Sequence, residues 1–101
     1  KDGDTIAVGS IRFTVLETPG HTPGSVVFQS DGALFTGDTL FAGSCGRVDF
    51  PGGDWGKMCA SLRRLANLPG DYKVYPGHEW SSTLENERAS NPYMRSAVQL
   101  G

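Results

Sequence analysis

The sequence predicts an α+β fold with one β-sheet and about two helices, on three observations. Short runs rich in β-branched and aromatic residues fill much of the first 37 positions, and glycine-containing turns separate them. After residue 54, apolar residues recur every three or four positions, as they do along one face of a helix. A further short run over residues 72–75 separates this helix from a second one.

Two β-hairpins are predicted at the start of the chain. Residues 5–8 and 10–17 flank a single glycine, and the second run alternates apolar with other side chains. Residues 25–29 and 33–36 are joined by Asp31-Gly32, which is a strong signal for a tight hairpin turn. The first third of the chain is therefore expected to form antiparallel strands.

A long loop and a helix follow the hairpins. Residues 37–53 are rich in glycine and lack periodicity, which indicates a functional loop with one turn inside it. Asp54 is placed to cap a helix that runs to about Asn67. The apolar face of this helix is expected to consist of Met58, Leu62, Leu65 and Leu68.

The last part of the chain predicts a strand over residues 72–75 and a second helix. Ser81 or Ser82 is expected to cap this helix, which runs to about Ser90, before Asn91-Pro92 breaks it. One or two further helical turns follow. Four charged residues are expected on a solvated helix face, namely Glu85, Glu87, Arg88 and Arg95.

The composition is that of an ordinary globular chain of 101 residues, with 38% hydrophobic and 20% charged residues. A formal net charge of −2 favours neither nucleic acid nor membrane as a partner. No apolar run approaches the roughly 20 residues that span a bilayer, so a soluble chain is expected. Cys45 and Cys59 are interpreted as free thiols of a cytoplasmic protein.

Three segments share one local pattern, in which a metal-binding side chain follows a strand beside glycine or proline. The segments are Thr18-Pro19-Gly20-His21-Thr22, Phe35-Thr36-Gly37-Asp38-Thr39 and Tyr75-Pro76-Gly77-His78-Glu79. Imidazole and carboxylate groups gathered at one edge of a sheet suit zinc, iron or manganese. Singly, each histidine could instead be a solvated or capping residue, and Asp38 a turn-former. The parallel settings of both histidines favour a shared metal site.

The strings TPGHTPGS, LFTGDTLFAGSCGRVDFPGGD and VYPGHEW, in this order, resemble the second half of the metallo-β-lactamase superfamily, and most closely its glyoxalase II-like thioesterases. The resemblance covers residues 5–95. It implies that His21 binds a first metal, that Asp38 bridges two metals, and that His78 binds the second. Zinc is the implied cofactor, two ions per complete site, with iron or manganese as alternatives.

The same family carries an H-x-H-x-D-H segment in its N-terminal half, which this chain lacks. The resemblance therefore implies that residues 1–101 form one partial domain, the C-terminal half of an αββα sandwich with a mixed sheet. An open apolar sheet face is then expected, covered by an N-terminal half or by self-association. Because half of the metal ligands are missing, the isolated chain is expected to bind metal weakly and to be inactive.

The implied function of the parent protein is hydrolysis of thioesters such as S-(2-hydroxyacyl)glutathione by a metal-bound hydroxide. Asp38 would orient the metals and the nucleophile, so Cys45 is interpreted as a packed loop thiol. Arg47 would contact the substrate carboxylate or pair with Asp49 or Asp54, and Trp80 would wall the substrate pocket. Alternatives are an iron-dependent persulfide dioxygenase of the same superfamily and a non-catalytic half-domain.

Overall fold

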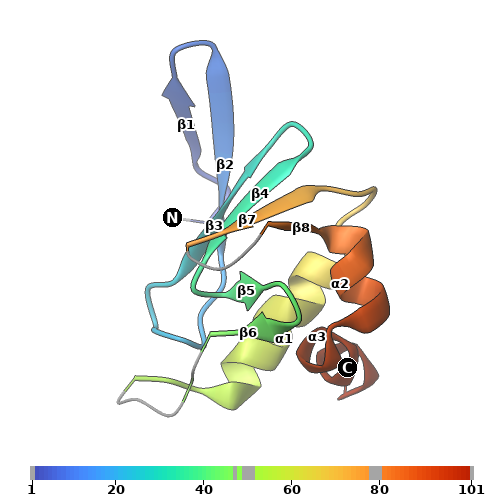
Figure 1. Ribbon diagram of the computed structural model, residues 1–101. Helices are drawn as coiled ribbons and strands as arrows, with labels where there is room; N and C mark the ends of the chain where they lie inside the picture. Colours follow the sequence, from blue (N-terminus) through green and yellow to red (C-terminus); the bar gives the residue numbers. More distant parts are fainter. Residues whose placement is uncertain (1, 47, 49–51, 78–80, 101) are drawn as a thin grey trace.

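The computed structural model describes residues 2–46, 48, 52–77 and 81–100, and it has strands in one layer and helices in another (Figure 1). The strands are β1 (Thr5–Val8), β2 (Ile11–Glu17), β3 (Val26–Ser30), β4 (Ala33–Gly37), β5 (Leu40–Phe41), β6 (Ser44–Cys45), β7 (Lys73–Pro76) and β8 (Ser82–Thr83). The helices are α1 (Trp55–Ala66), α2 (Leu84–Ser90) and α3 (Pro92–Leu100).

The main sheet has the strand order β1-β2-β3-β4-β7-β8. Its first four strands form the two predicted hairpins and continue into each other, so each pairs antiparallel with the next. β7 then pairs parallel with β4 after a crossover that contains α1, which makes the sheet mixed. β5 and β6 form a separate two-stranded ribbon just after β4.

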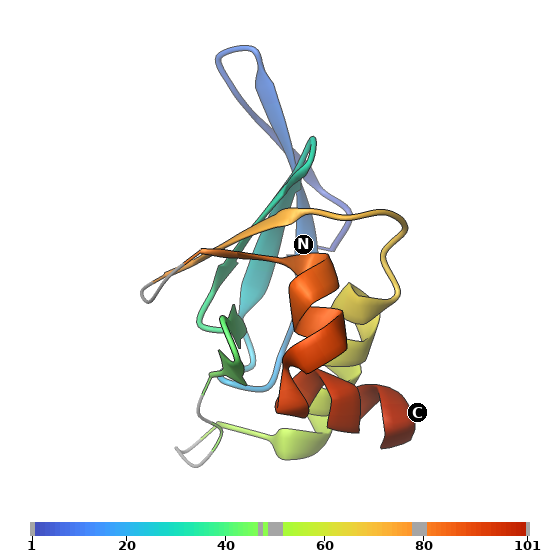
Figure 2. The same cartoon turned by 45° about the vertical axis from the view of Figure 1, so that its right-hand side comes forward.

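Alternate residues of each strand face opposite sides of the sheet, and only one side is covered by helices (Figure 2). Leu34 of β4 lies opposite Val74 of β7, and both are fully buried in the core on the helix side. Met58, Leu62 and Leu65 of α1 complete this core, as their helical spacing predicted. Burial of this apolar face stabilises α1 far more than its own helix propensity does.

The other side of the sheet presents aromatic side chains from four strands, and three of these side chains lie in register across β3, β4 and β7. Phe28 pairs with Phe35, and Phe35 pairs with Tyr75. The rings of Phe35 and Tyr75 are stacked with centroids 5.3 Å apart, and Phe13 meets the ring of Phe35 edge-on at 5.6 Å. Phe35 and Tyr75 nevertheless keep 39% and 38% of their surfaces exposed. An apolar hollow lies on this face, between Ile6, Phe13, Phe28 and Phe35.

The structure confirms the predicted α+β class, with a mixed sheet, and the predicted cap of α1. Asp54 accepts a hydrogen bond from the backbone N–H of Lys57 at 3.0 Å, and the helix ends at Ala66. After β4, however, the segment predicted as a loop with one turn, residues 37–53, contains the β5–β6 ribbon.

One expectation for the C-terminal part, the capping residue of α2, was wrong. Thr83, rather than Ser81 or Ser82, caps α2 by accepting a hydrogen bond from the Asn86 N–H at 3.1 Å. Ser82 does not fill this role because its hydroxyl donates to a carboxylate oxygen of Glu87. The last turns form a third helix of nine residues, because Asn91 caps it and Met94 and Ala97 are fully buried.

Candidate metal centre

His21 and Asp38 lie together at the edge of the sheet where β4 ends. Nε2 of His21 is 3.7 Å from Oδ2 of Asp38, although the two residues belong to different loops. Their side chains are 22% and 49% exposed, so both are open to solvent. The sequence predicted this convergence from the position of each residue after a strand.

The chain leading to His78 reaches the same edge. The backbone N–H of Gly77 donates to the carbonyl of Gly37 at 2.9 Å, which joins the residue before His78 to the residue before Asp38. This bond extends the parallel pairing of β4 and β7 by one step beyond the bulge at residues 35–37. Gly37 has φ 52°, a left-handed conformation that turns the chain directly into Asp38.

Gly46 packs against both candidate ligands. A β-carbon at this position would lie 1.8 Å from the carbonyl oxygen of Asp38 and 3.2 Å from Cβ of His21. The N–H of Gly46 also donates to the carbonyl of Thr39. Any side chain at residue 46 would therefore have to displace the backbone of Asp38.

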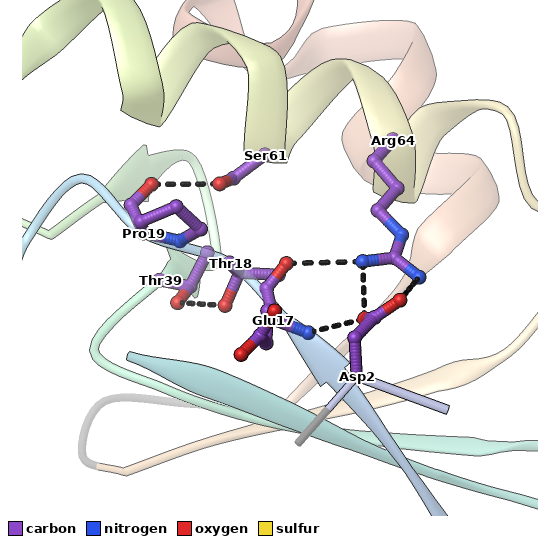
Figure 3. Close-up of polar contacts among 7 residues, drawn as sticks. All are labelled: Asp2, Glu17, Thr18, Pro19, Thr39, Ser61 and Arg64. Carbon is purple, nitrogen blue, oxygen red and sulfur yellow. Dashed lines mark hydrogen bonds and ion pairs between the residues drawn. The ribbon is translucent and has the colours of Figure 1, made fainter. Parts of the chain in front are cut away.

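A buried pair of hydroxyl groups joins the two ligand loops (Figure 3). Oγ1 of Thr18 and Oγ1 of Thr39 lie 3.0 Å apart, and both residues are fully buried. Thr18 stands three residues before His21, and Thr39 directly follows Asp38. This hydrogen bond therefore fixes the separation of the two loops at their bases.

Helix α1 holds the His21 loop from the other side. The hydroxyl of Ser61 donates to the carbonyl of Pro19 at 2.7 Å (Figure 3). The N–H of Asp54 donates to the carbonyl of Gly20 at the same distance. A β-carbon at Gly20 would come within 2.5 Å of Cα of Met58, so this loop lies directly on the helix. The loop conformation is thus set by α1 as well as by the sheet.

An exposed ion pair anchors the strand that precedes this loop. The guanidinium of Arg64 donates to both carboxylate oxygens of Asp2 and to the carbonyl of Glu17 (Figure 3). The hydrogen bond from Arg64, together with one from the Glu17 N–H, lowers the pKa of Asp2 below its ordinary value. The contact links the end of β2 to α1 one residue before Thr18.

Replacing Thr18 and Thr39 by valine tests the hydroxyl pair. We expect T18V and T39V each to lower the free energy of unfolding by about 1–3 kcal/mol, because each leaves one buried hydroxyl without its partner. The double variant should lose less than the sum of the two, since it leaves no unpaired hydroxyl. Urea unfolding of the wild type, the two single variants and the double variant measures the coupling between the two hydroxyl groups. Strictly additive losses of stability would show that the two groups are not coupled.

The donor atoms described at this edge suit a divalent metal ion. Two donors that share one ion at about 2.0–2.2 Å each lie no more than about 4.4 Å apart. The separation of Nε2 of His21 and Oδ2 of Asp38 falls within that limit. An imidazole and a carboxylate are also common ligands of zinc and iron. The site therefore fits a metal in both donor chemistry and spacing.

Three of the predicted site residues, Arg47, His78 and Trp80, lie outside the described residues. Within the part of the chain that the structure describes, no group of three histidine, cysteine, aspartate or glutamate side chains lies close enough to hold an ion. The described portion of the candidate site is therefore the pair His21 and Asp38.

Cys45 does not have the environment of a nucleophile. Burial, together with the nearby Cys59, raises the pKa of the Cys45 thiol to about 11, so it is protonated at neutral pH. Both cysteines are free, and Cys45 packs against the hydrophobic core. These features agree with its interpretation as a packed loop thiol.

Glu87 was expected on a solvated helix face but is buried. Only 1% of its surface is exposed, and its carboxylate is surrounded by hydrogen-bond donors from three parts of the chain. Arg88 is likewise engaged, since it donates to the carbonyls of Ala66, Leu68 and Gly70 at the end of α1. Glu85, in contrast, is exposed as expected.

The chain belongs to the metallo-β-lactamase superfamily, because the sequence model of the Metallo-beta-lactamase superfamily matches residues 1–78. Several similar proteins carry a more specific name. The hydroxyacylglutathione hydrolase of Rhodopseudomonas palustris (strain HaA2) is 46% identical over 89% of this chain and 38% of its own length. The hydroxyacylglutathione hydrolase GloC of Haemophilus influenzae is 37% identical over 95% of this chain and 47% of its own length.

Solved structures agree with this assignment. ETHE1 from Myxococcus xanthus superposes with a TM-score of 0.88 at 36% identity, covering 97% of this chain and 48% of that one. TTHA1623 in a di-iron-bound form superposes with a TM-score of 0.81 at 42% identity, covering 92% of this chain and 46% of that one. The chain thus spans about half the length of these relatives.

Among the described residues, no helix has the length and apolar character needed to cross a membrane.

Proposed function

We propose that this chain is the C-terminal half of a metallo-β-lactamase domain, residues 1–101, whose complete form hydrolyses thioesters such as S-(2-hydroxyacyl)glutathione in the cytoplasm. The observation that carries the proposal is the approach of Nε2 of His21 to Oδ2 of Asp38, 3.7 Å apart, in loops joined by a buried hydrogen bond. Relatives named hydroxyacylglutathione hydrolase cover almost all of this chain and support the substrate class.

The proposed metal set comprises His21 and Asp38 from the described residues and His78, which follows Gly77. His21 would bind one zinc ion, His78 the other, and Asp38 both. Bound divalent metals supply Lewis acidity, which polarises a thioester carbonyl and makes water nucleophilic at neutral pH. The protein contributes a fixed placement of the ligands, because the loops of His21 and Asp38 are joined at Thr18 and Thr39.

The remaining ligands would come from a second half of the domain that packs on the aromatic sheet face. This face exposes 39% of Phe35 and 38% of Tyr75 beside an apolar hollow, which is the surface a second sheet would cover. The candidate metal pair lies at the end of the strands that form this face, so ligands on the covering sheet could reach it. Arg47 and Trp80 are proposed to contact the substrate there.

Two preparations test the proposal. One is this chain alone; the other, which we call the two-half protein, joins it behind the complementary half of GloC from Haemophilus influenzae. We expect the two-half protein to contain about two metal ions per molecule by elemental analysis and to hydrolyse S-lactoylglutathione. The chain alone should contain little metal and show no turnover, because it lacks half of the ligands.

Iron must be compared with zinc in the same assay. The similarity to ETHE1 from Myxococcus xanthus favours an iron-dependent persulfide dioxygenase as the second candidate. The di-iron-bound form of TTHA1623 supports iron as an alternative metal. Oxygen consumption with a glutathione persulfide, in place of thioester hydrolysis, would establish that alternative. A folded two-half protein with neither metal nor turnover would instead indicate a non-catalytic half-domain and contradict the proposal.

A further inference from the structure

The carboxylate of Glu87 is buried without any cation in contact with it among the described residues. Its Oε1 accepts hydrogen bonds from the Gly43 N–H and from Nδ2 of Asn91, both at 2.8 Å. Its Oε2 accepts from the hydroxyl of Ser82 at 2.6 Å and from Nδ2 of Asn86 at 3.3 Å. Burial alone would raise the pKa of Glu87, but these four donors lower it overall, so the group is ionised at neutral pH.

Asn91 extends the same arrangement. Its side-chain amide donates to the carbonyls of Phe41 and Ser44, at 3.3 and 3.0 Å, and its Oδ1 caps α3. Asn91 is fully buried and stands one helical turn after Glu87. The two side chains together therefore hold both strands and the turn of the β5–β6 ribbon.

The segments joined in this way are those that carry the predicted site residues. The β5–β6 ribbon begins two residues after Asp38 and ends two residues before Arg47. Ser82 lies four residues after His78. A single buried carboxylate is thus bonded to both of the chain segments that lead away from the candidate ligands Asp38 and His78.

We propose that Glu87, with Asn91, is a positioning residue of the metal centre, which holds the β5–β6 ribbon after Asp38 and strand β8 at a fixed separation. This inference rests on the proposed function, because it concerns the same metal site. A carboxylate suits the task since both of its oxygens accept, and all four of its neighbours offer donors. An ionised acceptor also makes these hydrogen bonds stronger than those of a neutral amide.

Glu87→Gln in the two-half protein tests the inference, with Glu85→Gln as the matched control on an exposed position of the same helix. Glutamine keeps the size of the side chain, but its NH₂ group would face an N–H donor in either orientation of the amide. Gly43 and Asn91 donate on one side of the carboxylate, and Asn86 donates on the other. We expect E87Q to weaken zinc binding by about 10- to 100-fold in a chelator competition. Losses of this size are found in other metal sites when residues that orient the metal ligands are replaced. E85Q should bind zinc within about twofold of the wild type.

The cobalt(II) spectrum and thermal unfolding separate positioning from stability. A positioning role predicts an altered cobalt spectrum in E87Q at a temperature where the variant is fully folded. If E87Q unfolds more easily but keeps the wild-type zinc affinity and cobalt spectrum, the inference is overturned and Glu87 is only structural. If the wild-type two-half protein itself binds no metal, the proposed function fails and the inference falls with it.

Should E87Q not fold, Ser82→Ala provides the test. It removes one of the four hydrogen bonds and leaves those from Gly43 and Asn91 in place. Zinc affinity is then expected to fall by several-fold, with the loss confined to one of the two ions. An unchanged affinity for both ions in folded S82A would overturn the inference.

Discussion

Asp38→Asn in the two-half protein is expected to lower the rate of thioester hydrolysis by about a thousandfold or more. Asp38 is the ligand proposed to be shared by both metals, and asparagine keeps its size while removing the negative charge. Loss of several kcal/mol of metal-dependent stabilisation corresponds to this factor, since each 1.36 kcal/mol changes a rate tenfold. Steady-state kinetics at saturating zinc, together with elemental analysis, measures the effect.

Asp31→Asn is the matched control for this variant. Asp31 lies in the exposed turn between β3 and β4, at the opposite end of β4 from Asp38, and loses the same charge. D31N is expected to keep its metal and its activity. Wild-type metal content and turnover in D38N would show that Asp38 is only a turn-former and would remove the basis of the proposed site.

Leu34 and Phe35 are neighbours on β4 that face opposite sides of the sheet, so truncating them tests what covers each side. In this chain alone, Leu34→Ala should lower the free energy of unfolding by about 2–5 kcal/mol, because Leu34 is fully buried against the helices. Phe35→Ala should cost only about 1 kcal/mol there, mainly from its contacts with Phe13 and Tyr75.

In the two-half protein, the loss of stability caused by Phe35→Ala should increase, whereas the loss caused by Leu34→Ala should stay nearly unchanged. If another sheet covers the aromatic face, Phe35 becomes a core residue and its truncation should cost about 3–5 kcal/mol. Urea unfolding of both variants in both preparations gives the four values. An equally small effect of F35A with and without the second half would mean that this face is not the interface.

Local signals made much of the fold predictable from the sequence. The hairpin turn at Asp31-Gly32 and the cap at Asp54 depend on residues a few positions away, and both form as expected. The approach of His21 to Asp38 was predictable for a similar reason, since each residue follows a strand of the same sheet.

The arrangement around Glu87 was not predictable, because it depends on a partner, Gly43, that is distant in the sequence. Nothing near Glu87 in the helix indicates that the Gly43 N–H will reach it from the β5–β6 ribbon. The hydroxyl of Ser82 donates to the same carboxylate, which leaves the capping of α2 to Thr83. The two short strands of the ribbon were missed because two residues carry no measurable periodicity.

The parallel pairing of β4 with β7 has a consequence for how the protein is made. Strands β1 to β4 can form by local hairpin closure, whereas residues 33–37 meet residues 73–76 only after α1 and the ribbon have been synthesised. Contacts between distant segments form later and more slowly than local ones, because the entropy of a long loop must be lost first. Asp38, which follows β4, therefore reaches its final position only after β7 has been synthesised and has paired with β4. We expect metal capture to be a late event of folding, which follows closure of this loop rather than guiding it.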